Sequence, residues 1–119
     1  MQNPTQPIQS ADTFLNAWKQ GVKFVGEEFF NVTVDHVDAA SDRNQLRPNL
    51  PMIRKRFGVL SRGEAIICLA MAGFYNPHFT ANFIKSDELE HLAVSGAIAF
   101  VDIPRTQILR DLIMTYKPW

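Results

Sequence analysis

The stretch that decides the fold runs from Ser61 to Pro77 and reads SRGEAIICLAMAGFYNP. Its last charged residue is Glu64, whereas a solvent-facing helix carries charge along one side at every turn. Ser61 and Glu64 have the S-x-x-E spacing of a capping box, which marks the start of a helix. Pro77 disfavours helical geometry in the residue before it, so the helix is expected to end at Asn76. The stretch therefore predicts a central helix that is buried on nearly all sides.

The composition is that of a single globular domain. The chain has 119 residues, of which 46% are hydrophobic, and its twelve basic and twelve acidic side chains balance to a formal charge of zero. A chain of this length buries about two thirds of its unfolded surface, so it needs neither a disulfide nor a metal to hold its fold. We expect a soluble, cytoplasmic protein, because no secretory signal opens the sequence and its longest uncharged run is broken by polar residues.

Helical spacing predicts most of the other elements. Residues 1–9 are polar and contain two prolines, so they are expected to form a flexible arm before one helical domain at 10–119. The first predicted helix carries apolar residues three and four positions apart, namely Leu15, Trp18, Val22, Val25 and Phe29. Gly21 and Gly26 interrupt this pattern, and we expect a close contact with another helix at one of them at least.

Further helices are predicted by cap and proline signals at 51–57, at 77–84 and from 86 or 87 to 100. A final helix follows with the apolar stripe Ile108, Leu109, Leu112, Ile113 and Tyr116. The predicted fold is all-α, a single compact bundle of five or six short helices around the buried central helix. The alternative is an α+β fold with a minimal two-stranded sheet from 31–37 and 97–103, with 39–49 as a loop.

Motifs of catalysis are absent from the sequence, and we assign no catalytic, cofactor-binding or metal-binding residue. Cys68 lies between Ile67 and Leu69, which predicts a buried and unreactive thiol. Glu88 and His91 have the E-x-x-H spacing found in di-iron bundles, but such a site needs a second pair and two further glutamates. A metal-dependent enzyme that uses Glu88 and His91 is therefore kept only as the second alternative function.

Positive charge is concentrated in one segment of an otherwise neutral chain. Half of the basic side chains lie between 43 and 62, where Asp42 and Glu64 flank them: Arg43, Arg47, Arg54, Lys55, Arg56 and Arg62. A patch of this kind can neutralise nucleic-acid phosphates, and binding would then fall steeply with salt. The alternative is a solvated face whose arginines pair with acidic side chains. Nucleic-acid binding by this segment is the first alternative function.

The preferred hypothesis is a small binding or interaction protein that acts through apolar and aromatic helix faces. Aromatic side chains make the first helix apolar over more than one face, and the candidate partner-binding residues are Phe14, Trp18, Phe24 and Phe30. Self-complementary helix faces commonly form two-fold dimers, so we expect a protein partner or a homodimer and no membrane insertion.

Overall fold

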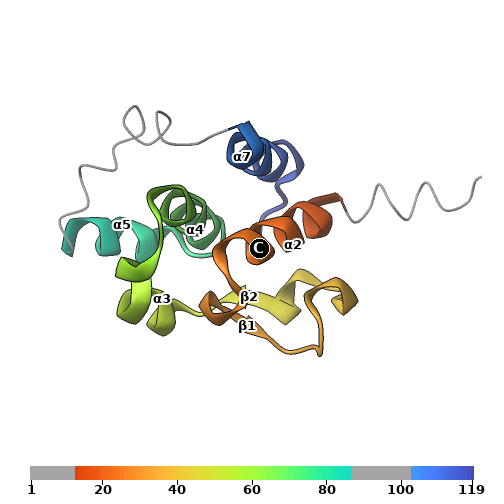
Figure 1. Ribbon diagram of the computed structural model, residues 1–119, viewed down its shortest axis with the longest axis horizontal. Helices are drawn as coiled ribbons and strands as arrows, with labels where there is room; N and C mark the ends of the chain where they lie inside the picture. The colour runs from red at the N-terminus through yellow and green to blue at the C-terminus, as the bar shows by residue number, and fades with distance from the viewer. Residues whose placement is uncertain (1–12, 87–102) are drawn as a thin grey trace, which may run out of the picture.

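The computed structural model describes residues 13–86 and 103–119, in which five α-helices and one small sheet are present (Figure 1). The α-helices are α2 (Thr13–Val25), α3 (Leu50–Arg56), α4 (Arg62–Tyr75), α5 (Pro77–Ser86) and α7 (Ile103–Thr115). The strands are β1 (Phe30–Val32) and β2 (Leu46–Pro48). Single turns of 3₁₀-helix are η1 (Glu27–Phe29), η2 (Val37–Ala39), η3 (Arg43–Gln45) and η4 (Phe57–Val59). The predicted arm at 1–9 and the predicted helix from 86 or 87 to 100 lie almost wholly outside the described residues.

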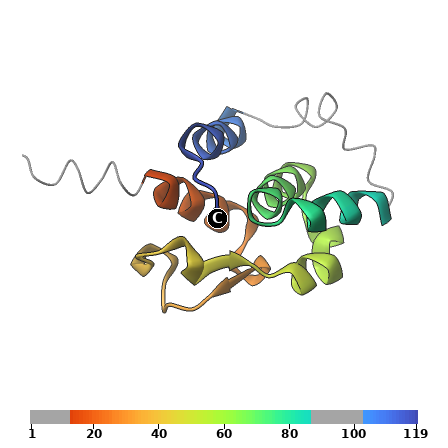
Figure 2. The same ribbon diagram turned by 180° about the vertical axis from the view of Figure 1, so that it is seen from behind.

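Helices α2, α4 and α7 contact one another and form the main helical layer. Figures 1 and 2 show α7 on one side of α2, with the two-stranded sheet on the other side. Helix α5 packs against α4, and α3 lies beside η4 and η1. Among the described residues, no helix combines the length and the hydropathy needed to cross a membrane.

Helix α4 matches the central helix predicted from the sequence. The Ser61 hydroxyl accepts from the backbone N–H of Glu64 at 3.2 Å, and the Glu64 carboxylate accepts from the backbone N–H of Ser61 at 2.9 Å. At the other end, the Asn76 side chain accepts from the backbone N–H of Phe79 at 3.0 Å and so caps α5. Arg62 is the only exposed residue of α4. The capping box and the proline therefore fixed both ends, as predicted.

The fold is mostly helical and also contains a sheet, so the all-α prediction was incomplete. Strand β1 pairs antiparallel with β2, with Phe30 opposite Pro48 and Val32 opposite Leu46. The predicted loop at 39–49 contains β2, because the capping box of Asp42 and Gln45 at η3 turns the chain back toward β1. Of the predicted partner strand 97–103, residues 97–102 lie outside the described residues and Ile103 begins α7.

The hydrophobic core is centred on α2 and α4. Trp18 is fully buried, and its indole N–H donates to the backbone carbonyl of Leu46 at 2.8 Å, which ties β2 to α2. Gly21 lies against Met71 of α4, since a Cβ added at Gly21 would stand 2.5 Å from the Met71 sulfur. The close helix contact expected at one glycine is therefore found at Gly21.

Candidate functional site

The four aromatic residues predicted to bind a partner lie mainly in the core. The exposed fractions of Phe14, Trp18 and Phe30 are 2%, 0% and 5%, and Phe24 is half-buried. The partner-binding prediction does not fit this placement, because the folded protein offers almost none of these three side chains to another molecule. The sheet and α7 cover α2 from two sides, and a sequence pattern cannot show which apolar side of a helix stays uncovered.

The first part of the basic segment holds the chain's last residues against the domain. The Arg43 guanidinium donates to the backbone carbonyls of Lys117 and Pro118, and it lies 4.6 Å from the centre of the Trp119 ring. The Trp119 indole N–H donates to the side-chain oxygen of Asn44 at 2.9 Å. A shallow pocket of about 260 Å³ opens beside these residues. Arg43, which lines this pocket, already donates to two carbonyl groups, so this arrangement has a structural role.

At least three of the remaining five basic side chains also make contacts within the protein. Arg54 lies over the rings of Phe79 and Phe83, 5.3 and 5.4 Å from their centres. Arg56 Nε is 3.2 Å from a carboxylate oxygen of Glu28, and Arg47 donates to Asn44 at 3.1 Å. Lys55 and Arg62 are exposed. The structure therefore distributes the six residues over η3, β2, α3 and α4, and at least four of them contact other parts of the chain.

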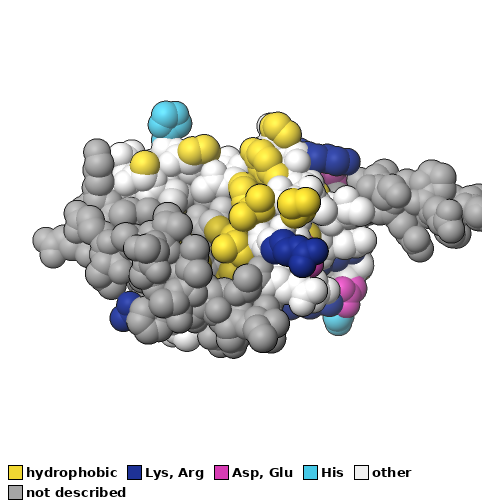
Figure 3. All heavy atoms as spheres, turned by 90° about the horizontal axis from the view of Figure 1, so that it is seen from above, with side chains coloured by type: hydrophobic (Ala, Val, Ile, Leu, Met, Phe, Trp, Pro, Cys, Tyr) yellow, Lys and Arg dark blue, Asp and Glu magenta, His cyan; other side chains and the backbone are white. Residues whose placement is uncertain are grey.

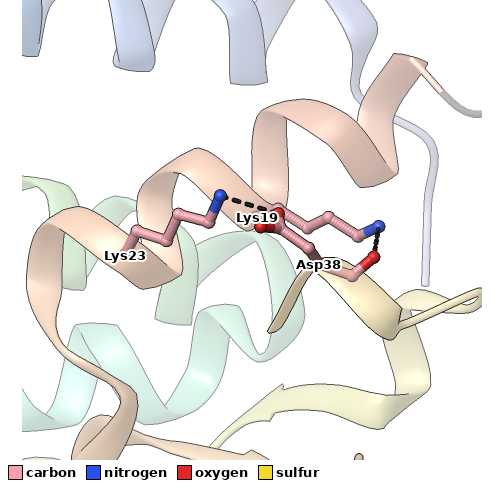
Figure 4. Close-up of polar contacts among 3 residues, drawn as sticks. All are labelled: Lys19, Lys23 and Asp38. Atoms are coloured by element: carbon pink, nitrogen blue, oxygen red, sulfur yellow. Dashed lines mark hydrogen bonds and ion pairs between the residues drawn. The ribbon is translucent and has the colours of Figure 1, made fainter. Parts of the chain in front are cut away.

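The acidic groups of the described residues are not arranged as a metal site. Within that part of the chain, no three His, Cys, Asp or Glu side chains come together as ligands, and Glu88 and His91 lie outside it. Asp38 instead binds Lys23, whose Nζ is 2.6 Å from the carboxylate, and the Asp38 carbonyl accepts from Lys19 at 3.0 Å (Figure 4). The hydrogen bond from Lys23 lowers the pKa of Asp38 below its usual value. These contacts join η2 to α2.

The most exposed apolar surface of the described residues lies on α7. Leu112 is fully buried against the domain, whereas Met114 and Ile113 are 77% and 57% exposed. Because an α-helix turns by about 100° per residue, Met114 lies about 160° from Leu112 on the helix surface. Gln107, Arg110 and Asp111 are exposed as well. We call these five exposed residues, Gln107, Arg110, Asp111, Ile113 and Met114, the outer face of α7.

Seen from above, hydrophobic side chains form a band over this side of the molecule, with basic side chains beside them (Figure 3). The seam between α2 and α7 is hollowed into two overlapping grooves of about 310 and 240 Å³. Both grooves are lined by Ala17, Gln20 and Asp111, and Gln107 lines the larger one. The outer face therefore continues into an open groove between α2 and α7.

Comparisons with known proteins add no relative: no protein-family model, no curated protein and no solved structure matches this chain.

Sequence reasoning missed the outer face of α7. Ile113 and Tyr116 were placed on the buried stripe of the last helix, yet they are 57% and 40% exposed. The ring of Tyr116 does reach the core edge, where it stacks on Phe74 at 4.9 Å. The signal that was available is Met114, which breaks the stripe by adding an apolar residue on the side opposite Leu112.

Proposed function

We propose that this protein is a small interaction protein that binds another polypeptide through the outer face of α7. The observation that carries the proposal is the contrast between Leu112, fully buried, and Met114, 77% exposed on the opposite side of the same helix. A helix with apolar residues on opposite sides removes all of them from water only when both sides are covered. Methionine is also common at binding surfaces, because its flexible thioether adapts to different partners.

The surroundings of Met114 support a protein partner over a small ligand. A site for a small molecule is usually a concave cavity that encloses its ligand, whereas the outer face is convex and its neighbouring grooves are wide open to solvent. Exposed apolar side chains next to charged ones are typical of the core and rim of a protein interface. The cytoplasmic location expected from the sequence stays a prediction.

Selection of binding peptides tests this proposal. A display library of amphipathic helical peptides is selected on the wild-type protein, and the enriched peptides are then measured on Met114→Glu. We expect their affinity to fall at least about tenfold, because a carboxylate would be desolvated in the contact. Val59→Glu is the matched control, since Val59 is 60% exposed but lies on η4. Peptides that bind Met114→Glu as well as wild type, or no enriched peptides at all, would contradict the proposal.

A further inference from the structure

We infer that the partner of the outer face is a second copy of this chain, with the two α7 helices side by side and parallel about a two-fold axis. The inference rests on the proposed function and adds the identity, direction and register of the partner. It comes from the order of the residues along the exposed side of α7, which makes that side complementary in charge to itself.

Four exposed residues form one stripe along α7. Gln107, Arg110, Asp111 and Met114 are spaced three, one and three positions apart, which places them on the same side of a helix. At about 100° per residue, Gln107 and Met114 lie within about 20° of each other, and Arg110 and Asp111 flank that line by about 50° on either side. The stripe therefore has neutral side chains along its centre, a cation on one flank and an anion on the other.

A two-fold axis parallel to the helices brings unlike flanks together. Rotation by half a turn places the Arg110 flank of one copy beside the Asp111 flank of the other, and the reverse pair forms on the far side of the axis. Met114 then meets Met114 of the second copy, and Gln107 meets Gln107 about two helical turns nearer the start of α7. An antiparallel pair would instead bring like flanks together, with Arg110 near Arg110 and Asp111 near Asp111.

The charges on this stripe are available for such a contact. Both Arg110 and Asp111 are exposed, and neither makes an ion pair with another of the described residues. Asp111 and Gln107 also line the groove between α2 and α7. A second α7 centred on the stripe would lie along this groove and cover it, so the contact would extend from α7 to the edge of α2.

Exchange of the two charges tests the partner. Sedimentation of the wild-type protein should show a concentration-dependent dimer, and Arg110→Asp or Asp111→Arg should each raise the dimer Kd by roughly tenfold or more, because like charges then face each other twice. A one-to-one mixture of the two variants should restore the dimer, since every facing pair is again of opposite sign. Circular dichroism and thermal unfolding check that each variant, changed only at an exposed position, is folded.

Two single-cysteine variants test the direction. In a parallel pair, Gln107→Cys and Met114→Cys should each form a disulfide with an identical copy under mild oxidation. In an antiparallel pair centred on this stripe, position 107 meets position 114, so cross-links would form only when the two variants are mixed. Cys68 is fully buried and does not compete for the oxidant.

Each outcome decides the inference separately from the proposed function. A wild-type protein that stays monomeric at the highest accessible concentration overturns the second copy as partner, while the peptide selection still decides whether the outer face binds a polypeptide. The charge pairing is overturned if neither charge variant changes the dimer Kd, or if the mixture of the two variants fails to restore the dimer. Cross-links that require mixing overturn the parallel direction.

Discussion

Replacing Gly21 by Ala should destabilise the protein, although the same change stabilises most helices. Ala is favoured over Gly by up to about 1 kcal/mol inside a helix. At Gly21, however, the added Cβ would stand 2.5 Å from the sulfur and 2.7 Å from the terminal methyl of Met71. The two facing atoms are the end of the Met71 side chain, which is fully buried, so they must shift within the packed core to admit the new Cβ. Overpacking of this kind costs about 1–3 kcal/mol, which leaves a net loss of up to about 2 kcal/mol.

Gly73 provides the matched control in the neighbouring helix α4. The nearest atom to a Cβ added there is the Thr80 hydroxyl oxygen at 3.7 Å, which is an ordinary contact. Gly73→Ala should therefore raise the free energy of unfolding by up to about 1 kcal/mol, or the melting temperature by about 4 °C in a domain of this size. Urea unfolding, followed by circular dichroism, measures both variants under the same conditions.

A double-mutant cycle separates the steric contact from other effects. When Met71→Ala removes the clashing side chain, Gly21→Ala should become neutral or stabilising, with an interaction energy of about 1–3 kcal/mol between the two positions. A Gly21→Ala variant that is stabilised as much as Gly73→Ala would show that Met71 does not oppose the added Cβ. An effect of Gly21→Ala that is the same with and without the Met71 side chain would show this as well.

Three further predictions concern α4 and the basic segment. Ala72 is fully buried and Ala70 is half-buried. In urea unfolding, Ala72→Asp should therefore lower the free energy of unfolding by about 3 kcal/mol or more, and Ala70→Asp should lower it clearly less. Equal decreases for the two variants would contradict this difference in burial. Burial raises the pKa of the Cys68 thiol from 9.0 to about 12, so its contribution to stability is complete below pH 9.0 and is lost as the pH rises toward 12. Between neutral pH and about pH 10, the free energy of unfolding should therefore fall more steeply with pH for wild type than for Cys68→Ala. Most arginines of the basic segment are engaged within the protein, so we expect wild type to elute from heparin below about 0.1 M salt; strong retention that Arg54→Ala, Lys55→Ala and Arg56→Ala together abolish would favour nucleic-acid binding.

The elements that the sequence predicted well are those with local causes. The ends of α4 depend on Ser61, Glu64 and Asn76, each of which bonds to a backbone group within three or four residues. The strands carry no such signal within their own residues, because three residues are too few for an alternating pattern, and the capping box before β2 does not specify the strand with which β2 pairs. The position of β2 depends on the bond from Trp18 to the Leu46 carbonyl, a contact that spans 28 residues.

Hydrophobic periodicity alone does not identify the outer face of α7, for a related reason. Periodicity identifies a buried face only when the opposite side is polar, and α7 carries Leu112 on one side and Met114 on the other. Which of the two is buried depends on where α2 and α4 lie, and those helices cover the Leu112 side. Apolar residues that the core does not bury therefore make the buried side of a helix harder to predict. The same residues mark the surface that we propose for binding. Met114 is exposed and lies between Arg110 and Asp111, whose opposite charges would pair with those of a second copy. The exchange of these two charges is therefore the decisive experiment.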